Sequence, residues 1–235
     1  MLIIIPYSRK AALIQWDGPI HENTISEVSE LNKKIQVSGI SSITETIPAF
    51  TSITVCYKDG NFSDIKLELE KLYSQLNTSE IEIHHRQWNL PMLPSSSLGE
   101  TVTPYLSMSA EQFLDAFNDI KFTIGMKGFL PGFLYLAGLP EQMHIPRKST
   151  PDRSIAKGSI AIGGAQCGIY PMESPGGWNV IGNCPIPTID FTNEDLSAFS
   201  IGDVVSFYSI DSEQAEIYDK RDWTLDQITK EFVAN

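Results

Sequence analysis

The chain has 235 residues, of which 42% are hydrophobic and 20% charged, a balance typical of a globular protein with a substantial core. Its 17 basic and 29 acidic residues give a formal net charge of −12, which argues against binding to nucleic acid or to anionic membranes. Its three cysteines form no C-x-x-C pair, so we expect reduced thiols in the cytoplasm, with neither a disulfide framework nor a metal site.

The first 85 residues predict an α+β domain. Apolar periodicity gives, in chain order, strands at 2–5 and 12–16, a helix from 24, strands at 43–47 and 52–57, a helix from about 63 and a strand at 81–85. Thr24 and Glu27 predict a capping box at the start of the first helix, and Gly39 predicts its end. We interpret this as a β-α-β-β-α-β order, a ferredoxin-like α/β sandwich with two helices on one face of the sheet.

Residues 86–235 predict a second domain, a closed β-barrel with a C-terminal helix. The stretch 86–107 is rich in Pro, Ser and Gly and predicts a linker or crossover. The expected elements that follow are a short helix capped by Ser109 and Gln112, strands at 120–126, 159–162, 178–181 and 204–208, and a helix capped by Thr224 and Gln227. Many short strands separated by Gly and Pro turns favour a barrel over an open sheet.

Three segments of the predicted barrel carry candidate chemistry. Residues 128–138 alternate glycines with aromatic residues, which predicts a groove or, taken alone and more readily, a tight barrel corner. Residues 145–158 gather Arg147, Lys148, Arg153 and Lys157, which predicts an anion site or a solvated loop. Residues 170–182 present main-chain N–H groups beside a tryptophan, as a ligand nest or as a Gly-rich hairpin with a core Trp.

Five motifs in these segments together resemble one family in order and spacing, the KipI family, also called allophanate hydrolase subunit 1 or the 5-oxoprolinase B subunit (PxpB). The motifs are Gly128-Phe-x-Pro-Gly-Phe-x-Tyr-Leu136, Pro146-Arg147, Gly158-Ser159, Tyr170-Pro171 and Ser174-Pro-Gly-Gly-Trp-x-x-Ile-Gly182. The later Ile201-Gly-Asp-Val-Val-Ser-Phe207 resembles the final barrel strand of the family. The resemblance implies that the barrel is cyclophilin-like.

The resemblance also implies a subunit that does not work alone. With a KipA-type partner (the 5-oxoprolinase C subunit), such subunits resemble ATP-dependent 5-oxoprolinases, which convert 5-oxoproline to glutamate, or related allophanate and urea amidohydrolases. The implied substrate is a small amide or lactam. ATP is implied for the complex, and no cofactor is assigned to this chain. Two alternatives remain open: a regulator that inhibits a sensor histidine kinase by binding it, and a subunit of a biotin-dependent carboxyltransferase.

Site roles follow from the residues and the resemblance together. The expected roles are catalytic main-chain donors at Ser174, Gly176 and Gly177, substrate binding by Arg147, Arg153, Tyr135, Tyr170, Trp178 and Gln166, and partner binding by Phe129 and Phe133. The sequence departs from the family at polar positions. Phe117 stands where the family has a histidine, Ser206 stands where an arginine is frequent, and residues 90–103 lack the family's Tyr-Gly-Gly…Gly-Pro-Asp pattern.

Overall fold

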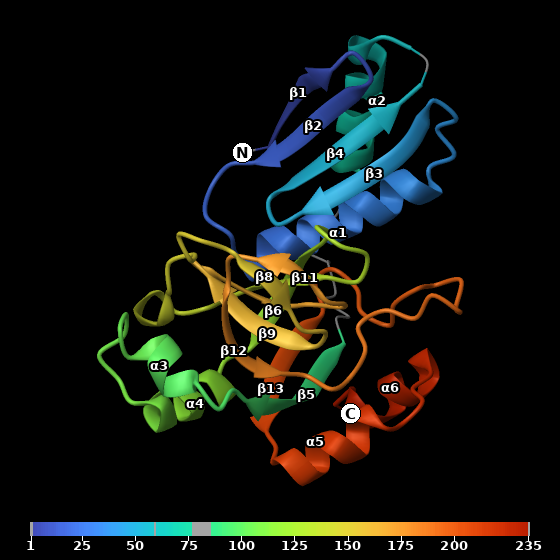
Figure 1. Ribbon diagram of the computed structural model, residues 1–235. Coiled ribbons are helices and arrows are strands. Elements are labelled where there is room, and N and C mark those ends of the chain that lie inside the picture. The colour runs from blue at the N-terminus through green and yellow to red at the C-terminus, as the bar shows by residue number, and fades with distance from the viewer. Residues whose placement is uncertain (1, 59, 77–85, 235) are drawn as a thin grey trace. The chain divides into compact units, whose positions relative to one another are not determined.

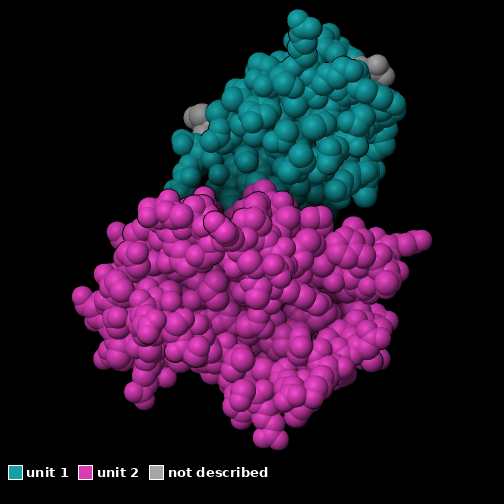
Figure 2. Space-filling model, in the orientation of Figure 1, with its two compact units in different colours: residues 1–84 teal, residues 85–235 magenta. Residues whose placement is uncertain are grey.

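The computed structural model describes residues 2–58, 60–76 and 86–234, and its contacts fall into two compact units, residues 1–84 and 85–235 (Figure 2). We propose that these units are the two domains expected at residues 1–85 and 86–235. No helix in the described ranges is both long enough and apolar enough to cross a bilayer.

The first unit is an α/β sandwich. Its elements are β1 (Leu2–Ser8), β2 (Ala11–Trp16), α1 (Glu22–Val37), β3 (Ile43–Ala49), β4 (Ser52–Tyr57) and α2 (Phe62–Ser74) (Figure 1). The strands form an antiparallel sheet in the order β1-β2-β4-β3. Alternate residues of β4, Ile53 and Val55, are fully buried with Leu31 of α1 and Leu69 of α2. The expected sandwich is therefore confirmed, while the strand expected at 81–85 lies outside the described residues.

The start of α1 differs from the prediction. The helix begins at Glu22, and its N-cap is His21, whose Nδ1 accepts a hydrogen bond from the main-chain N–H of Asn23 at 3.3 Å. Glu27 instead accepts a hydrogen bond from the indole N–H of Trp16 at 2.8 Å. The predicted capping box of Thr24 and Glu27 was therefore wrong, because the glutamate binds a tertiary partner.

The second unit is a closed seven-stranded barrel. Its strands are β5 (Gln87–Pro94), β6 (Phe122–Lys127), β7 (Leu134–Ala137), β9 (Ser159–Gly163), β10 (Gln166–Ile169), β12 (Asn179–Asn183) and β13 (Val204–Ser209). They run in the order β6-β13-β5-β12-β9-β10-β7, and pairing of β7 with β6 closes the ring. Around it are β8 (Asp152–Ile155) paired with β11 (Ser174–Gly176), helices α3 (Leu98–Val102), α4 (Ala110–Asn118), α5 (Ser212–Asp219) and α6 (Leu225–Phe232), and a 3-10 turn at Glu141–Met143. This confirms the predicted barrel.

The expected linker at 86–107 is wrong in its first part, which forms β5. This strand runs parallel to β13 and buries Trp88, Leu90 and Met92 in the core. We did not expect a strand here because Pro91 and Pro94 have no main-chain N–H to donate a hydrogen bond to a neighbouring strand. The described pairing of β5 with β12 covers only Leu93 and Pro94, so the missing N–H of Pro91 leaves no gap in that ladder.

Aromatic rings fill the barrel core beneath α4. Phe117, which the resemblance led us to expect in place of a family histidine, is fully buried, with its ring centroid 5.3 Å from that of Phe122 and 5.5 Å from that of Phe207. The capping boxes predicted at Ser109 and Thr224 are both present. Phe117 is thus a packing residue and contributes no polar group.

Candidate functional site

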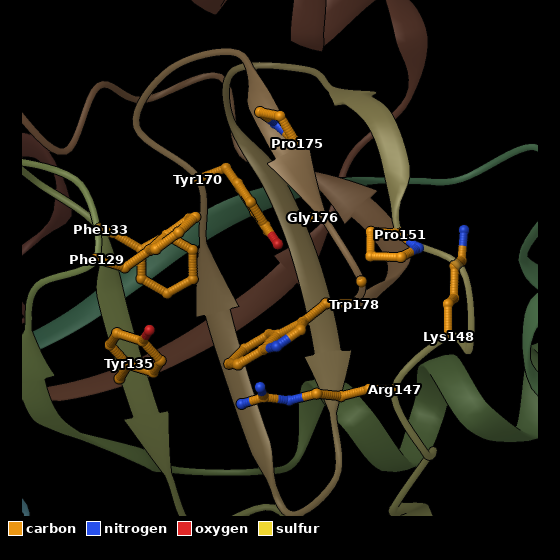
Figure 3. A pocket seen from close by; sticks show the side chains of 11 residues that line it. Phe129, Phe133, Tyr135, Arg147, Lys148, Pro151, Tyr170, Pro175, Gly176 and Trp178 are labelled. Atoms are coloured by element: carbon orange, nitrogen blue, oxygen red, sulfur yellow. The ribbon is translucent and has the colours of Figure 1, made fainter.

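The three segments singled out in the sequence meet at one pocket of the second unit, with a volume of about 400 Å³ (Figure 3). Its lining consists of Phe129, Phe133, Tyr135, Arg147, Lys148, Pro151, Tyr170, Pro175, Gly176, Gly177 and Trp178. Residues more than forty positions apart in the chain come together because β7, β10, β9 and β12 are consecutive around the barrel. Because all three segments line one pocket, the structure favours the groove over a barrel corner, a solvated loop and a Gly-rich hairpin taken separately.

The pocket wall is a cluster of aromatic rings centred on Phe133. Its ring centroid lies 4.6 Å from Tyr135, 4.9 Å from Tyr170 and 5.8 Å from Trp178, the last two contacts in an edge-to-face arrangement. Gly163 and Gly168 lie behind this wall. A Cβ at Gly163 would be 2.5 Å from the indole nitrogen of Trp178, so only glycine leaves room for the ring.

Arg147 supplies the positive charge of the pocket. Its guanidinium carbon lies 5.5 Å from the centroid of the Trp178 ring, a cation–π stack that Figure 3 shows along the lower wall. Lys148 is already paired, since its ammonium lies 2.5 Å from a carboxylate oxygen of Asp152. No carboxylate of the described residues lies within salt-bridge distance of Arg147, so its charge is available to a ligand.

Two hydrogen bonds fix the main chain on either side of Arg147. The side-chain amide of Asn179 donates to the carbonyl of Pro146 at 2.8 Å and, at 3.3 Å, to the carbonyl of Ile162 on β9. The main-chain N–H of Lys148 donates to the carbonyl of Gly177 at 2.7 Å. The arginine is thus attached to the barrel through both of its chain neighbours.

Two phenols add neutral hydrogen-bonding groups. Burial raises the pKa of Tyr135, and the nearby charge of Arg147 partly opposes this shift. Burial also raises the pKa of Tyr170, helped by Tyr135 and Asp152 and opposed by Arg147. Both hydroxyls therefore remain protonated at neutral pH. In Figure 3 the hydroxyl of Tyr170 points into the pocket.

Three of the predicted site residues lie outside this lining. Arg153 is exposed on β8, and Gln166 is half-buried at the start of β10. The Ser174 hydroxyl is buried and has no hydrogen-bond partner among the described residues. The lining adds Lys148, Pro151 and Pro175, of which the basic cluster already pointed to Lys148.

Among the residues that the structure describes, the lining contains no Ser, Cys, His, Asp or Glu. Of the described lining residues, Lys148 and the two tyrosines are the groups that general acid–base or nucleophilic catalysis could use, and Lys148 is paired with Asp152. What the pocket offers is a guanidinium, two phenols, the main chain of Gly176 and Gly177, and apolar walls. Chemically this arrangement can bind a small planar anion and orient it.

Comparison with known proteins identifies the family. The family described as carboxyltransferase domain, subdomain C and D, matches residues 2–199. A protein of Escherichia coli O157:H7 that is named as the B subunit of 5-oxoprolinase is 32% identical over 202 residues, covering 84% of this chain and 91% of that protein. Its namesake from Bacillus subtilis (strain 168) is 29% identical over 223 residues, covering 88% of this chain and 92% of that protein.

Solved structures share the fold. TTHA0988 superposes with a TM-score of 0.74 at 22% identity over 86% of this chain, and Kluyveromyces lactis urea carboxylase with 0.68 at 18% identity over 92%. The chain spans 40% of the TTHA0988 chain and 22% of the urea carboxylase, so it corresponds to one part of each. Together with the five motifs and the pocket that they form, these matches show that the chain belongs to the carboxyltransferase domain, subdomain C and D, family, which includes the 5-oxoprolinase B subunits.

Proposed function

We propose that the chain is the B-type subunit of an amidohydrolase complex, specifically an ATP-dependent 5-oxoprolinase acting with a KipA-type C subunit in the cytoplasm. The names of its relatives support the amidohydrolase assignment. The observation that carries the site assignment is an aromatic pocket in which Arg147, paired with no carboxylate of the described residues, stacks on Trp178. 5-Oxoproline is a small flat lactam with one carboxylate, which matches that charge and those walls.

In this proposal the pocket binds the substrate and the partner supplies the reacting groups. Arg147 binds the carboxylate as a charge-assisted pair, and the phenols of Tyr135 and Tyr170 donate to the lactam. Among the described lining residues there is no Ser, Cys, His, Asp or Glu, and the ammonium of Lys148 is paired with Asp152, which is consistent with this division of labour. ATP acts as a substrate of the complex, and we assign none of its contacts to this chain.

The test is reconstitution of the chain with its partner subunits, followed by ATP-dependent formation of glutamate from 5-oxoproline. Arg147→Ala removes one charge-assisted bond and is expected to raise KM about 10- to 100-fold, with a smaller change in kcat. Arg9→Ala, an exposed arginine of the other unit, is the matched control. An active complex with an unchanged KM would disprove the role of Arg147, and inactivity with every partner subunit would disprove the proposed activity.

A regulator that binds a sensor histidine kinase is the second candidate, and Phe129 is the observation that favours it. Its ring is 60% exposed at the pocket rim, although it contacts Phe133 and Tyr170 edge-on. Its φ of 69° is rare for a residue with a side chain. If the chain inhibits kinase autophosphorylation and Phe129→Ala abolishes inhibition, this candidate replaces the first.

Carboxylation of urea by the reconstituted complex would instead indicate the carboxyltransferase alternative.

A further inference from the structure

A second cavity of the barrel unit, with a volume of about 440 Å³, shares no residue with the pocket described above. It lies between the start of β5, the end of β6, the loop that precedes β13 (orange in Figure 1) and α6. Its lining is Arg86, Lys127, Asp195, Ser197, Ala198, Phe199, Ser200, Leu225, Asp226 and Thr229. Charged and hydroxyl side chains make this cavity polar, in contrast to the aromatic pocket.

Two cations lie together in this cavity. Arg86 donates from Nη1 to the carbonyl of Ala198 at 2.8 Å, and Lys127 donates from Nζ to the carbonyl of Phe199 at 2.9 Å. Because these carbonyls belong to consecutive residues, both charges lie at the same stretch of the loop. A guanidinium has five N–H donors and an ammonium three, so each cation keeps donors for a ligand.

The buried acid Asp203 forms no salt bridge with either cation among the described residues. Asp203 is 3% exposed, and its carboxylate accepts hydrogen bonds from the main-chain N–H groups of Arg86 and Ser200 and from the indole of Trp88. Burial lowers the pKa of Lys127, and the charge of Asp203 only partly opposes this. Within residues 2–58, 60–76 and 86–234, no carboxylate forms a salt bridge with Arg86 or Lys127.

The remaining charges of the lining indicate the kind of ligand. Asp195 and Asp226 are exposed carboxylates on the loop and at the first turn of α6. A phosphate would meet two like charges there, whereas a zwitterion complements two cations and two carboxylates. We propose that this cavity binds a free amino acid, with its carboxylate on Arg86 and Lys127 and its ammonium group facing Asp195 and Asp226. The proposal does not depend on the function assigned to the aromatic pocket.

The test uses the full chain alone, titrated separately with each of the twenty amino acids in isothermal calorimetry and saturation-transfer NMR. At least one amino acid is expected to bind, and Lys127→Gln is expected to weaken that binding about tenfold or more. Lys121→Gln, an exposed lysine that lines no described cavity, is the matched control and should leave affinity unchanged.

Asp195→Asn removes an exposed charge and leaves the fold-anchoring bonds of Arg86 and Lys127 in place, so it separates binding from misfolding. This substitution should weaken binding of the amino acid. It should leave unchanged the affinity for the matching carboxylic acid, which lacks the amino group. The proposal is overturned if no amino acid binds, if inorganic phosphate binds more tightly than every amino acid, or if Lys127→Gln and Asp195→Asn both leave affinity unchanged.

Discussion

Asn179 holds Arg147 in place without lining the pocket. Its side chain is 4% exposed, and its amide joins the carbonyl of Pro146, next to the arginine, to the carbonyl of Ile162 on β9. A carbonyl left unpaired in a buried place costs about 1–3 kcal/mol. The amide therefore stabilises the one turn of chain from which the guanidinium extends over Trp178.

We expect Asn179→Ala to lower the free energy of unfolding by roughly 1–3 kcal/mol and to raise KM for 5-oxoproline in the reconstituted complex more than it changes kcat. The reason is that Arg147 loses its fixed position while the reacting groups are untouched. Chemical denaturation and steady-state kinetics measure the two effects. Asn183→Ala is the control, since Asn183 makes a similar bond to the carbonyl of Lys157 away from the pocket. Equal kinetic effects of the two variants would contradict a positioning role.

Sequence reasoning found most of the pocket residues because their chemistry is visible in single letters. Arg147 and Trp178 are conspicuous in a Gly- and Pro-rich segment. Asn179 was not singled out, because its role depends on two carbonyls whose positions only the fold determines. Ser174 shows the converse: we expected it to supply a main-chain donor beside Gly176 and Gly177, but it lies on β11 outside the pocket lining, and its hydroxyl is buried.

At the scale of elements, β9 and β12 together set the width of the aromatic pocket. Gly163 ends β9 directly behind Trp178, and an added Cβ would lie 2.5–2.6 Å from three atoms of the indole. Such contacts force the ring or the strand to move, and overpacking of this kind costs on the order of 1–3 kcal/mol.

Gly163→Ala is therefore expected to destabilise the fold by that amount and to push Trp178 toward Arg147, narrowing the pocket. Thermal unfolding and the emission spectrum of the tryptophans are the measurements. Gly99→Ala serves as the control, because its Cβ would make only an ordinary contact, at 3.9 Å from Ala110, and alanine favours the helix α3. If Gly163→Ala matches this control in stability and in emission, the wall is more adaptable than the structure indicates.

The elements that sequence patterns did not predict are strands whose own residues give no strand signal and which form because of their pairing partners. The prolines of β5 led us to expect a linker, but this segment forms a strand because it pairs with β13. The three-residue β11 and the four-residue β8 are too short to show a period of two, and they exist because they pair with each other. The helices capped by Ser109 and Thr224 were predictable because a capping box is a purely local signal.

At the scale of the whole molecule, the placement of positive charge contrasts with the overall balance. The chain carries a formal charge of −12, yet both cavities present cations that no described carboxylate pairs, Arg147 in one and Arg86 with Lys127 in the other. An acidic surface repels polyanions, while local cations in hollows still attract small acids. The charge pattern thus favours small carboxylates over nucleic acid as ligands of this fold.

Buried thiols make the whole fold sensitive to alkaline pH. Cys167 and Cys184 are at most 1% exposed, and burial raises the pKa of both, that of Cys184 to about 12. In the unfolded chain a cysteine ionises near about 8.5. A group whose pKa is higher in the folded state contributes its full stability below the unfolded pKa and loses it as pH rises toward the folded pKa.

We therefore expect the free energy of unfolding to fall as pH rises from about 8.5 toward 10, by up to roughly 1.4 kcal/mol per thiol for each pH unit above the unfolded pKa. Urea denaturation at a series of pH values in this window, under reducing conditions, measures the slope. Cys184→Ala should make the slope shallower, because one thiol no longer has to stay protonated in the fold. Cys56→Ala is the control, since Cys56 is only half-buried on β4. A stability that stays constant from about pH 8 to pH 10, or a Cys184→Ala slope equal to that of Cys56→Ala, would show that these thiols do not link folding to protonation.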